Sequence, residues 1–182
     1  GGDIFVSGAY VATDLWDNPR ATDADKTFAS DVLGYKWRVD QAAVTGGVYE
    51  VQSRFPQFEN WNGTYSNQLN EECYVVESPD SFYPSDKEKG ATIMRYSENN
   101  LVAGTAFDAG KYRTVVIGFP FETITDQSQR NHLMKSTLDF FTNHKSGIDS
   151  DKSKKKSIKR EEGDAPSIGW ANYLVDKKGQ II

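Results

Sequence analysis

No stretch of the 182-residue chain approaches the roughly 18 consecutive apolar residues that a membrane-spanning helix requires. Cysteine is nearly absent, and Cys73 alone can form neither an internal disulfide nor a cysteine-based metal site. His132 and His144 are the two histidines of the chain, too few for a zinc site of the usual kind. The sequence therefore predicts no membrane span, no metal and no cofactor.

Charge of both signs is present but unevenly spread. The formal net charge is −5, whereas residues 145–164 carry seven Lys or Arg against five Asp or Glu. The rest of the chain is more acidic, and we expect it to repel nucleic acid. The basic segment has acidic neighbours and no interleaved aromatic residues, which favours a solvated linker over a nucleic-acid motif. We predict one folded domain over residues 1–144, a charged linker over 145–165, and either the start of a following module or a C-terminal hairpin over 166–182.

Two short apolar runs predict buried strands. They are Asp3-Ile-Phe-Val6 and the segment 112–119, which contains Val115-Val116-Ile117. Runs that are apolar on both faces are typical of parallel strands covered on both sides. We expect these two strands to be adjacent and central in a mainly parallel sheet.

Capping patterns predict two helices. Thr22 and Asp25 form a capping-box pattern before an apolar stripe that ends at Gly34. Asp126 and Gln129 begin a second helix over 126–143. The apolar face of that second helix is predicted to consist of Leu133, Met134, Leu138 and Phe141.

The middle of the chain alternates between strand patterns and a long polar loop. Residues 47–52 alternate like a strand, and 91–96 with 101–107 predict a hairpin. Residues 53–90 are polar, aromatic and interrupted by three prolines. A loop of that length inside a compact domain is usually functional or packs on itself.

Short motifs at the predicted strand ends carry a family resemblance. The Ser7-Gly8 turn, the helix ending in Val-Leu-Gly-Tyr and the late Gly-Phe-Pro-Phe-Glu sequence resemble the class I glutamine amidotransferase-like fold. The run 115–141 is similar to a domain of secreted Bacteroidetes proteins known as xanthan-lyase-like, and the resemblance spans roughly residues 1–144. It implies an α/β, flavodoxin-like fold with a mainly parallel sheet and flanking helices, and a complete domain that begins upstream of Gly1. It also implies a multidomain parent protein in the periplasm or outside the cell, connected with polysaccharides.

The catalytic pattern of that superfamily is incomplete in this sequence. Active members place a nucleophilic cysteine on a sharp strand–helix turn, where this chain has Ser7 after the bulky Phe5. They also carry His-Pro-Glu after a late strand, where Phe119 precedes the proline and Glu122 is the remaining acid. Ser7 and Glu122 are the candidate catalytic residues, although a serine needs an adjacent base. The alternatives are a small residue at a tight turn for Ser7 and helix capping or ion pairing for Glu122.

The aromatic loop is the second candidate site. Sugar binding uses flat aromatic faces together with planar amides and carboxylates, and this loop supplies both. The candidate substrate-binding residues are Trp61, Asn62, Tyr65 and Tyr83. Alternatively, the aromatic side chains anchor the long loop onto the body of the domain. Partly exposed rings would indicate binding, and buried rings would indicate anchoring.

Three functions follow from these observations. The first is a non-catalytic accessory or carbohydrate-associated domain of an exported, xanthan-lyase-like polysaccharide-processing protein. The second is a serine hydrolase or amidase that uses Ser7 with Glu122. The third is a contribution to a lyase activity of the parent protein, for which Arg95, Arg113 and Arg130 are the available cations. The expected partners are a polysaccharide and other domains of the same parent chain.

Overall fold

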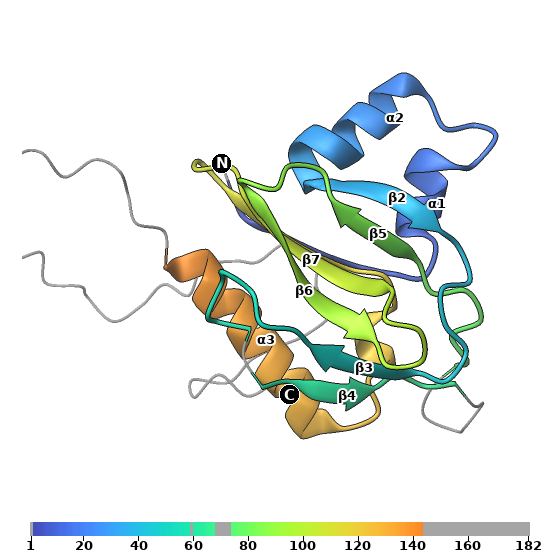
Figure 1. The fold of residues 1–182 in the computed structure, drawn as a ribbon, viewed down its shortest axis with the longest axis vertical. Coiled ribbons are helices and arrows are strands. Elements are labelled where there is room, and N and C mark those ends of the chain that lie inside the picture. The colour runs from blue at the N-terminus through green and yellow to red at the C-terminus, as the bar shows by residue number, and fades with distance from the viewer. Residues whose placement is uncertain (1, 59, 68–73, 144–182) are drawn as a thin grey trace, which may run out of the picture. The chain divides into compact units, whose positions relative to one another are not determined.

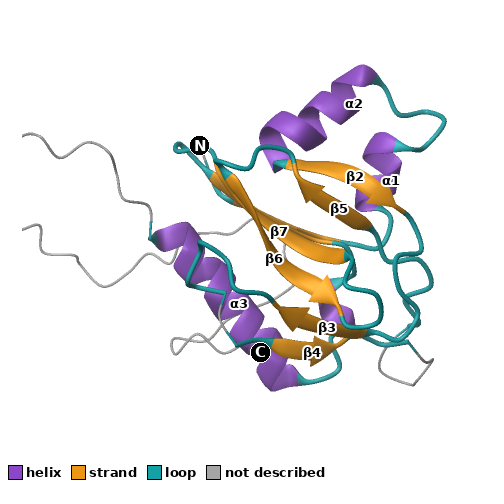
Figure 2. Ribbon diagram, in the orientation of Figure 1, coloured by secondary structure: helices purple, strands orange, loops and turns teal. Residues whose placement is uncertain are grey.

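The computed structural model describes residues 2–58, 60–67 and 74–143 (Figures 1 and 2). The predicted linker at 145–165, the predicted module or hairpin at 166–182, and Cys73 lie outside these residues. The described part contains a six-stranded sheet, a separate two-stranded sheet and several short helices beside one long helix. No helix among these residues has the length and apolar character needed to cross a membrane.

The main sheet is mixed and has the strand order β1-β8-β7-β6-β3-β4. β1 runs parallel to β8, with Ile4 opposite Thr114 and Ser7 opposite Ile117. Every other neighbouring pair is antiparallel, and the sheet curls into a half-barrel (Figure 1). Its strands are β1 (Ile4–Ser7), β3 (Gly47–Glu50), β4 (Asn62–Thr64), β6 (Gly90–Tyr96), β7 (Val102–Asp108) and β8 (Arg113–Ile117).

The predicted flavodoxin-like fold, with a mainly parallel sheet and flanking helices, is wrong. One strand pair is parallel and the others are antiparallel, and β1 lies at an edge of the sheet, not at its centre. The apolar run in β8 reflects burial on both faces, which α3 and the N-terminal helices provide without a parallel sheet around it. The prediction of a hairpin was correct, since β6 and β7 pair antiparallel.

The second sheet pairs β2 (Tyr35–Val39) with β5 (Ser81–Pro84) in antiparallel register. Tyr35 and Phe82 lie on its inner face with their ring centroids 4.9 Å apart, and both are buried. Lys36 is directly opposite Tyr83, one residue further along each strand, so these two side chains point to the other face. Figure 1 shows this two-stranded sheet beside β6 and β7 and next to α1 and α2.

The N-terminal helices are short and consecutive. α1 (Val11–Trp16) is followed by α2 (Asp23–Thr27), which continues as a π-helix, η1 (Phe28–Leu33). The predicted capping box is present, because the Thr22 and Asp25 side chains each accept a hydrogen bond from the other residue's backbone N–H. Gly34 ends this segment with a φ of 81°, a conformation that favours glycine.

Alternate residues of β8 contribute to two hydrophobic cores. Val115 and Ile117 pack in the core that contains Leu133 and Phe140 of α3 (Gln127–Thr142). Val116 points the opposite way, into a core with Leu33 of the π-helix and Tyr35 of β2. β8 is therefore the strand against which both layers of the domain pack.

The face of α3 that packs on the sheet agrees with the predicted one at Leu133, Met134 and Phe141 and differs from it at Leu138. Its buried residues are Leu133, Ser136, Thr137 and Phe140. Leu138, which was predicted to face the core, is 50% exposed. Arg113 of β8 fixes the end of this helix, because its guanidinium lies 4.7 Å over the Phe140 ring and donates to the Phe140 carbonyl.

The predicted loop at 53–90 contains two short strands, β4 and β5. Neither was visible in the sequence, since β4 is three residues long and polar and β5 follows two prolines of the loop. Most of the aromatic side chains of this region are buried, and Tyr74 and Tyr83 are exposed. The buried aromatic residues of this region are Phe58, Trp61, Tyr65 and Phe82.

Candidate functional site

A groove of about 420 Å³ lies beside β3 and β4, where the chain leaves one strand and returns to the other. Its polar lining consists of planar amide and carboxylate side chains, and Val51 with two buried aromatic residues forms the apolar part. We call it the amide groove. Its polar residues are Glu50, Gln52, Asn60 and Asn62, and its aromatic residues are Phe58 and Trp61.

Hydrogen bonds between the two ends of the returning loop hold the amide groove in shape. The Glu50 N–H donates to the Trp61 carbonyl at 2.8 Å, and the Trp61 N–H donates to Glu50 Oε2 at 2.6 Å. Asn60 has a φ of 64°, in the left-handed region that asparagine tolerates better than most residues. This conformation turns the chain into β4 and places Asn60 and Asn62 on the same groove.

Trp61 forms part of the groove's wall and fixes it to α3. Its indole is 1% exposed, and Nε1 donates to the Gln129 carbonyl at 2.8 Å. A ring this deeply buried has no free face to stack against a sugar. Its contribution to the groove is therefore shape and rigidity.

Tyr65 and Tyr83 do not line the amide groove. Tyr65 is 1% exposed and stacks on Phe119, with ring centroids 5.0 Å apart. Tyr83 is 46% exposed, but it lies on β5 in the other sheet. Of the four residues predicted to bind substrate, the structure brings Trp61 and Asn62 together at one groove.

Ser7 and Glu122 lie on separate elements, with no hydrogen bond between them in the described structure. Ser7 is half-buried at the end of β1, and its hydroxyl has no hydrogen bond to a described histidine or carboxylate. Glu122 is exposed in the 3-10 helix η2 (Phe121–Thr123), and Oε1 accepts a hydrogen bond from the Tyr74 hydroxyl at 2.8 Å. The catalytic roles of Ser7 and Glu122 stay predictions.

The three arginines considered for lyase chemistry are each engaged by the fold. Arg113 pairs with Asp108 at 2.8 Å. Arg95 donates to the Asn100 carbonyl at 2.7 Å, and Arg130 donates to the Ile124 carbonyl. None of these arginines lines the amide groove.

Two groove residues, Glu50 and Gln52, were missed in the sequence. Both lie within the strand pattern at 47–52 and are two residues apart, a spacing that places side chains on the same face of a strand. That spacing, together with the amides already noted in the following loop, was the signal that could have indicated the groove.

Asp80 is a further residue that sequence reasoning did not identify. Its side chain is buried, and its carboxylate accepts hydrogen bonds from the N–H groups of Ala12 (2.7 Å) and Thr13 (3.2 Å) and from the Thr13 hydroxyl (2.6 Å). Burial raises the pKa of Asp80 to about 6, against the effect of these hydrogen bonds, and the charge of Asp40 adds to the increase. Trp37 Nε1 donates to the same Thr13 hydroxyl at 3.0 Å, so Asp80 fixes the start of α1 and, through it, the Trp37 ring.

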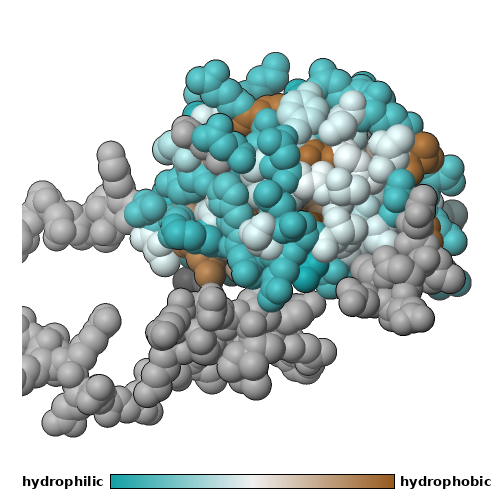
Figure 3. All heavy atoms as spheres, turned by 90° about the horizontal axis from the view of Figure 1, so that it is seen from below, coloured by the Kyte–Doolittle hydropathy of each residue, from teal (hydrophilic) through white to brown (hydrophobic). Residues whose placement is uncertain are grey.

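The face of the described chain that is seen from below is predominantly polar. Figure 3, which views the molecule from below, shows hydrophilic and intermediate residues with small, separate hydrophobic spots. Among the residues that the structure describes, no group of three His, Cys, Asp or Glu side chains is arranged to hold a metal ion.

Comparison of this chain with known protein families, with curated proteins and with solved structures finds no match in any of the three. The resemblance to xanthan-lyase-like proteins stays a prediction.

Proposed function

We propose that this domain is a non-catalytic, carbohydrate-associated domain that holds a polysaccharide chain in the amide groove. The observation that carries the proposal is the set of four planar polar side chains around one concave surface: Glu50, Gln52, Asn60 and Asn62. Amide groups both donate and accept hydrogen bonds, as sugar hydroxyls do, and a carboxylate accepts from them. Concave sites with a few fixed polar groups on an apolar wall are the usual form of a ligand site.

The lining of the groove favours a neutral, hydroxyl-rich ligand over other classes. Among the described residues that line the groove there is no Lys or Arg, and the ionisable one, Glu50, is acidic. A nucleic acid requires cations for its phosphates, and none is supplied here. Trp61 and the bonds between residues 50 and 61 hold the wall and the Glu50 carboxylate in place, which lowers the cost of ordering the site when a ligand binds.

The short motifs at Ser7-Gly8 and at 118–122 add context to the proposal. The resemblance of the run 115–141 to xanthan-lyase-like proteins supports an accessory role within an exported polysaccharide-processing protein, and a periplasmic or extracellular setting. The proposal itself rests on the groove and requires neither the superfamily's fold nor its catalytic triad.

Replacing two exposed groove residues tests the proposal. Gln52→Ala combined with Asn62→Ala removes two hydrogen-bonding side chains with little loss of packing, since both are exposed. At about 1 kcal/mol for each hydrogen bond, we expect binding to weaken on the order of tenfold to thirtyfold. Affinity electrophoresis in gels that contain neutral glucans, galactomannans or xanthan would measure it.

A matched control is Asn131→Ala, which truncates an exposed asparagine of α3 outside the groove lining. It should bind as the unmodified protein does, and all variants should retain the same melting temperature. Equal binding by the double variant would show that the amide groove is not the site. A failure of the unmodified protein to bind every polysaccharide in the series would overturn the proposed function.

A further inference from the structure

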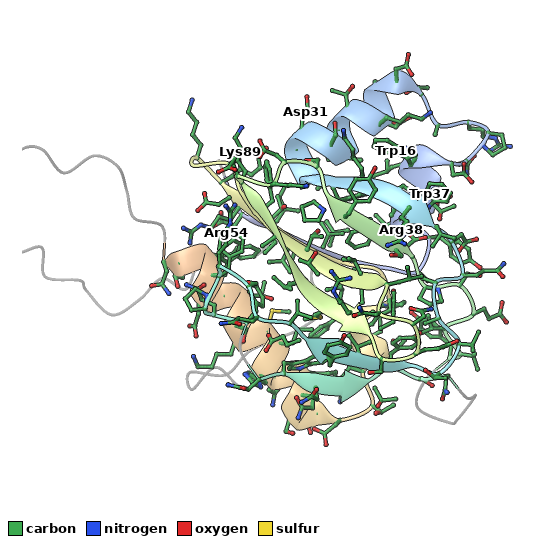
Figure 4. All side chains as sticks on the ribbon, in the orientation of Figure 1. Trp16, Asp31, Trp37, Arg38, Arg54 and Lys89 are labelled. Carbon is green, nitrogen blue, oxygen red and sulfur yellow. The ribbon has the colours of Figure 1, made fainter. Side chains whose placement is uncertain are left out.

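A second cavity, of about 490 Å³, lies beside the two-stranded sheet and shares no lining residue with the amide groove. The π-helix, β2 and the segment after β5 contribute its polar side chains, and Figure 4 shows Asp31 and Lys89 on neighbouring elements at the same end of the molecule. We call it the lysine cavity. Its polar lining residues are Ser30, Asp31, Lys36, Ser85, Asp86 and Lys89.

Backbone contacts fix the frame of the lysine cavity. The Ser85 hydroxyl donates to the Ser30 carbonyl at 2.6 Å, and the Ser85 N–H donates to the Gly34 carbonyl at 2.9 Å. Asp86 Oδ1 accepts from the N–H groups of Glu88 and Lys89 at 2.7 and 3.2 Å. The segment after β5 is thereby tied to the π-helix, and π-helical turns occur frequently at functional sites.

The two lysines differ in how far their charge is neutralised. Lys89 Nζ lies 3.9 Å from Asp86 Oδ2, a loose and exposed pair. Lys36 is half-buried and forms no ion pair with any residue that the structure describes. Lys36 is therefore the cation that a ligand's negative group would neutralise.

Tyr83 is not a lining residue of the lysine cavity but provides an aromatic surface beside Lys36, at the edge of the cavity. It lies directly opposite Lys36 in the antiparallel pair, which brings the two side chains to the same face at a Cβ separation of about 5 Å. Its ring is exposed on the side of the two-stranded sheet away from the buried Tyr35 and Phe82.

We propose that the lysine cavity binds an acidic sugar, with Lys36 holding the sugar's carboxylate and Tyr83 covering a face of its ring. Asp31, Asp86 and Ser30 supply oxygens for the hydroxyl groups. A polyanion such as nucleic acid fits poorly, because the two aspartates repel a second negative charge. A sugar carboxylate carries one charge among several hydroxyls, and this matches the mixed lining. The inference takes its ligand class from the proposed function and adds a separate subsite.

Titrations followed by NMR distinguish the two sites, with methyl glucuronide and methyl glucoside as probes. We expect the glucuronide to shift the backbone amide signals of the residues that line the lysine cavity. The glucoside should bind there at least about tenfold more weakly, because it lacks the carboxylate that forms a charge-assisted hydrogen bond with Lys36. Lys36→Gln should weaken glucuronide binding by a similar factor. Tyr83→Ala should also weaken glucuronide binding, because the sugar ring loses its aromatic contact. Raising the ionic strength should weaken glucuronide binding to the unmodified protein, because salt screens the attraction between Lys36 and the carboxylate.

The controls separate a failure of this inference from a failure of the proposed function. Lys111→Gln removes an exposed lysine outside both sites and should change nothing. Lys36→Gln should leave neutral-polysaccharide binding at the amide groove unchanged, and the Gln52 and Asn62 double variant should leave glucuronide binding unchanged. Equal affinity for glucuronide and glucoside, or unaltered glucuronide binding by Lys36→Gln, would refute the lysine cavity alone. If glycine, a zwitterion, bound the lysine cavity more tightly than the glucuronide did, the proposed ligand would be wrong and a zwitterion would be the better candidate.

Discussion

Asp80 has an ionisable side chain buried where three element ends meet. Its carboxylate holds the first turn of α1, its N–H donates to the Gly118 carbonyl at 2.7 Å, and its carbonyl accepts from the Tyr96 hydroxyl at 2.7 Å. Asp80 forms no ion pair with a described cation, and the other titratable groups around it are Asp40, Tyr35 and Tyr96. The cost of this burial should therefore be measurable as a dependence of stability on pH.

Because the pKa of Asp80 in the folded state is raised to about 6 from 3.8, the folded state binds this proton more tightly than the unfolded state does. The resulting stability is fully present below about pH 4 and is lost as the pH rises through 6. We expect the free energy of unfolding of the unmodified protein, relative to Asp80→Asn, to fall by about 2 kcal/mol between pH 4 and pH 7. Urea unfolding of both proteins across this range measures the difference.

Asp40→Asn is the control for Asp80, since it removes a minor cause of the pKa shift and should preserve most of the pH dependence. If the difference in the free energy of unfolding between the unmodified protein and Asp80→Asn stayed constant from pH 4 to pH 7, the raised pKa of Asp80 would be contradicted. The comparison of two proteins at each pH cancels the opposing contributions of Glu98 and Asp126, whose pKa values are lowered by hydrogen bonds to their carboxylates.

The connection between the amide groove and α3 depends on one indole. Trp61 is buried and donates to the Gln129 carbonyl, so its loss leaves both a cavity and an unpaired carbonyl. We expect Trp61→Ala to lower the free energy of unfolding by about 3–5 kcal/mol. Trp61→Phe should cost less, on the order of 1–3 kcal/mol, because the ring volume is mostly kept and one donor is lost.

Tyr83→Ala is the matched control for Trp61→Ala, since it truncates an exposed aromatic ring and should change stability by about 0.5 kcal/mol or less. Chemical denaturation of the three variants decides the question. A stable Trp61→Ala protein would show that the indole does not anchor the loop.

Local elements were predictable where local chemistry determines them. Asp126 and Gln129 located the start of α3, Thr22 and Asp25 located α2, and the β6–β7 hairpin followed from two strand patterns around a short turn. The polar strand β4 and the π-helix escaped prediction, since neither has a residue pattern of its own. The packed face of α3 was predicted correctly at Leu133, Met134 and Phe141 but not at Leu138, which is exposed. Ser136 and Thr137 are buried beside that face although both are polar.

The arrangement of the whole domain was not predictable from those patterns. An apolar run such as Val115-Val116-Ile117 indicates that both faces of a strand are covered, but it does not determine which strand lies beside it or in which direction. Local sequence patterns did not predict either cavity. The lysine cavity is lined by residues near 30, 36 and 85–89, which lie close together because β2 pairs with β5.

The pairing of β1 with β8 has a consequence for how the chain is made. β1 is the first strand of the chain, and Ile4 pairs with Thr114, 110 residues later. At a synthesis rate of about 5–20 residues per second, the partner of the apolar segment Ile4–Val6 is synthesised on the order of 5 to 20 seconds after that segment. The β6–β7 hairpin, by contrast, closes on a timescale of about microseconds once both strands have emerged. During synthesis, therefore, β1 is an apolar segment whose partner strand β8 is still missing, and it depends on protection from its surroundings until β8 emerges.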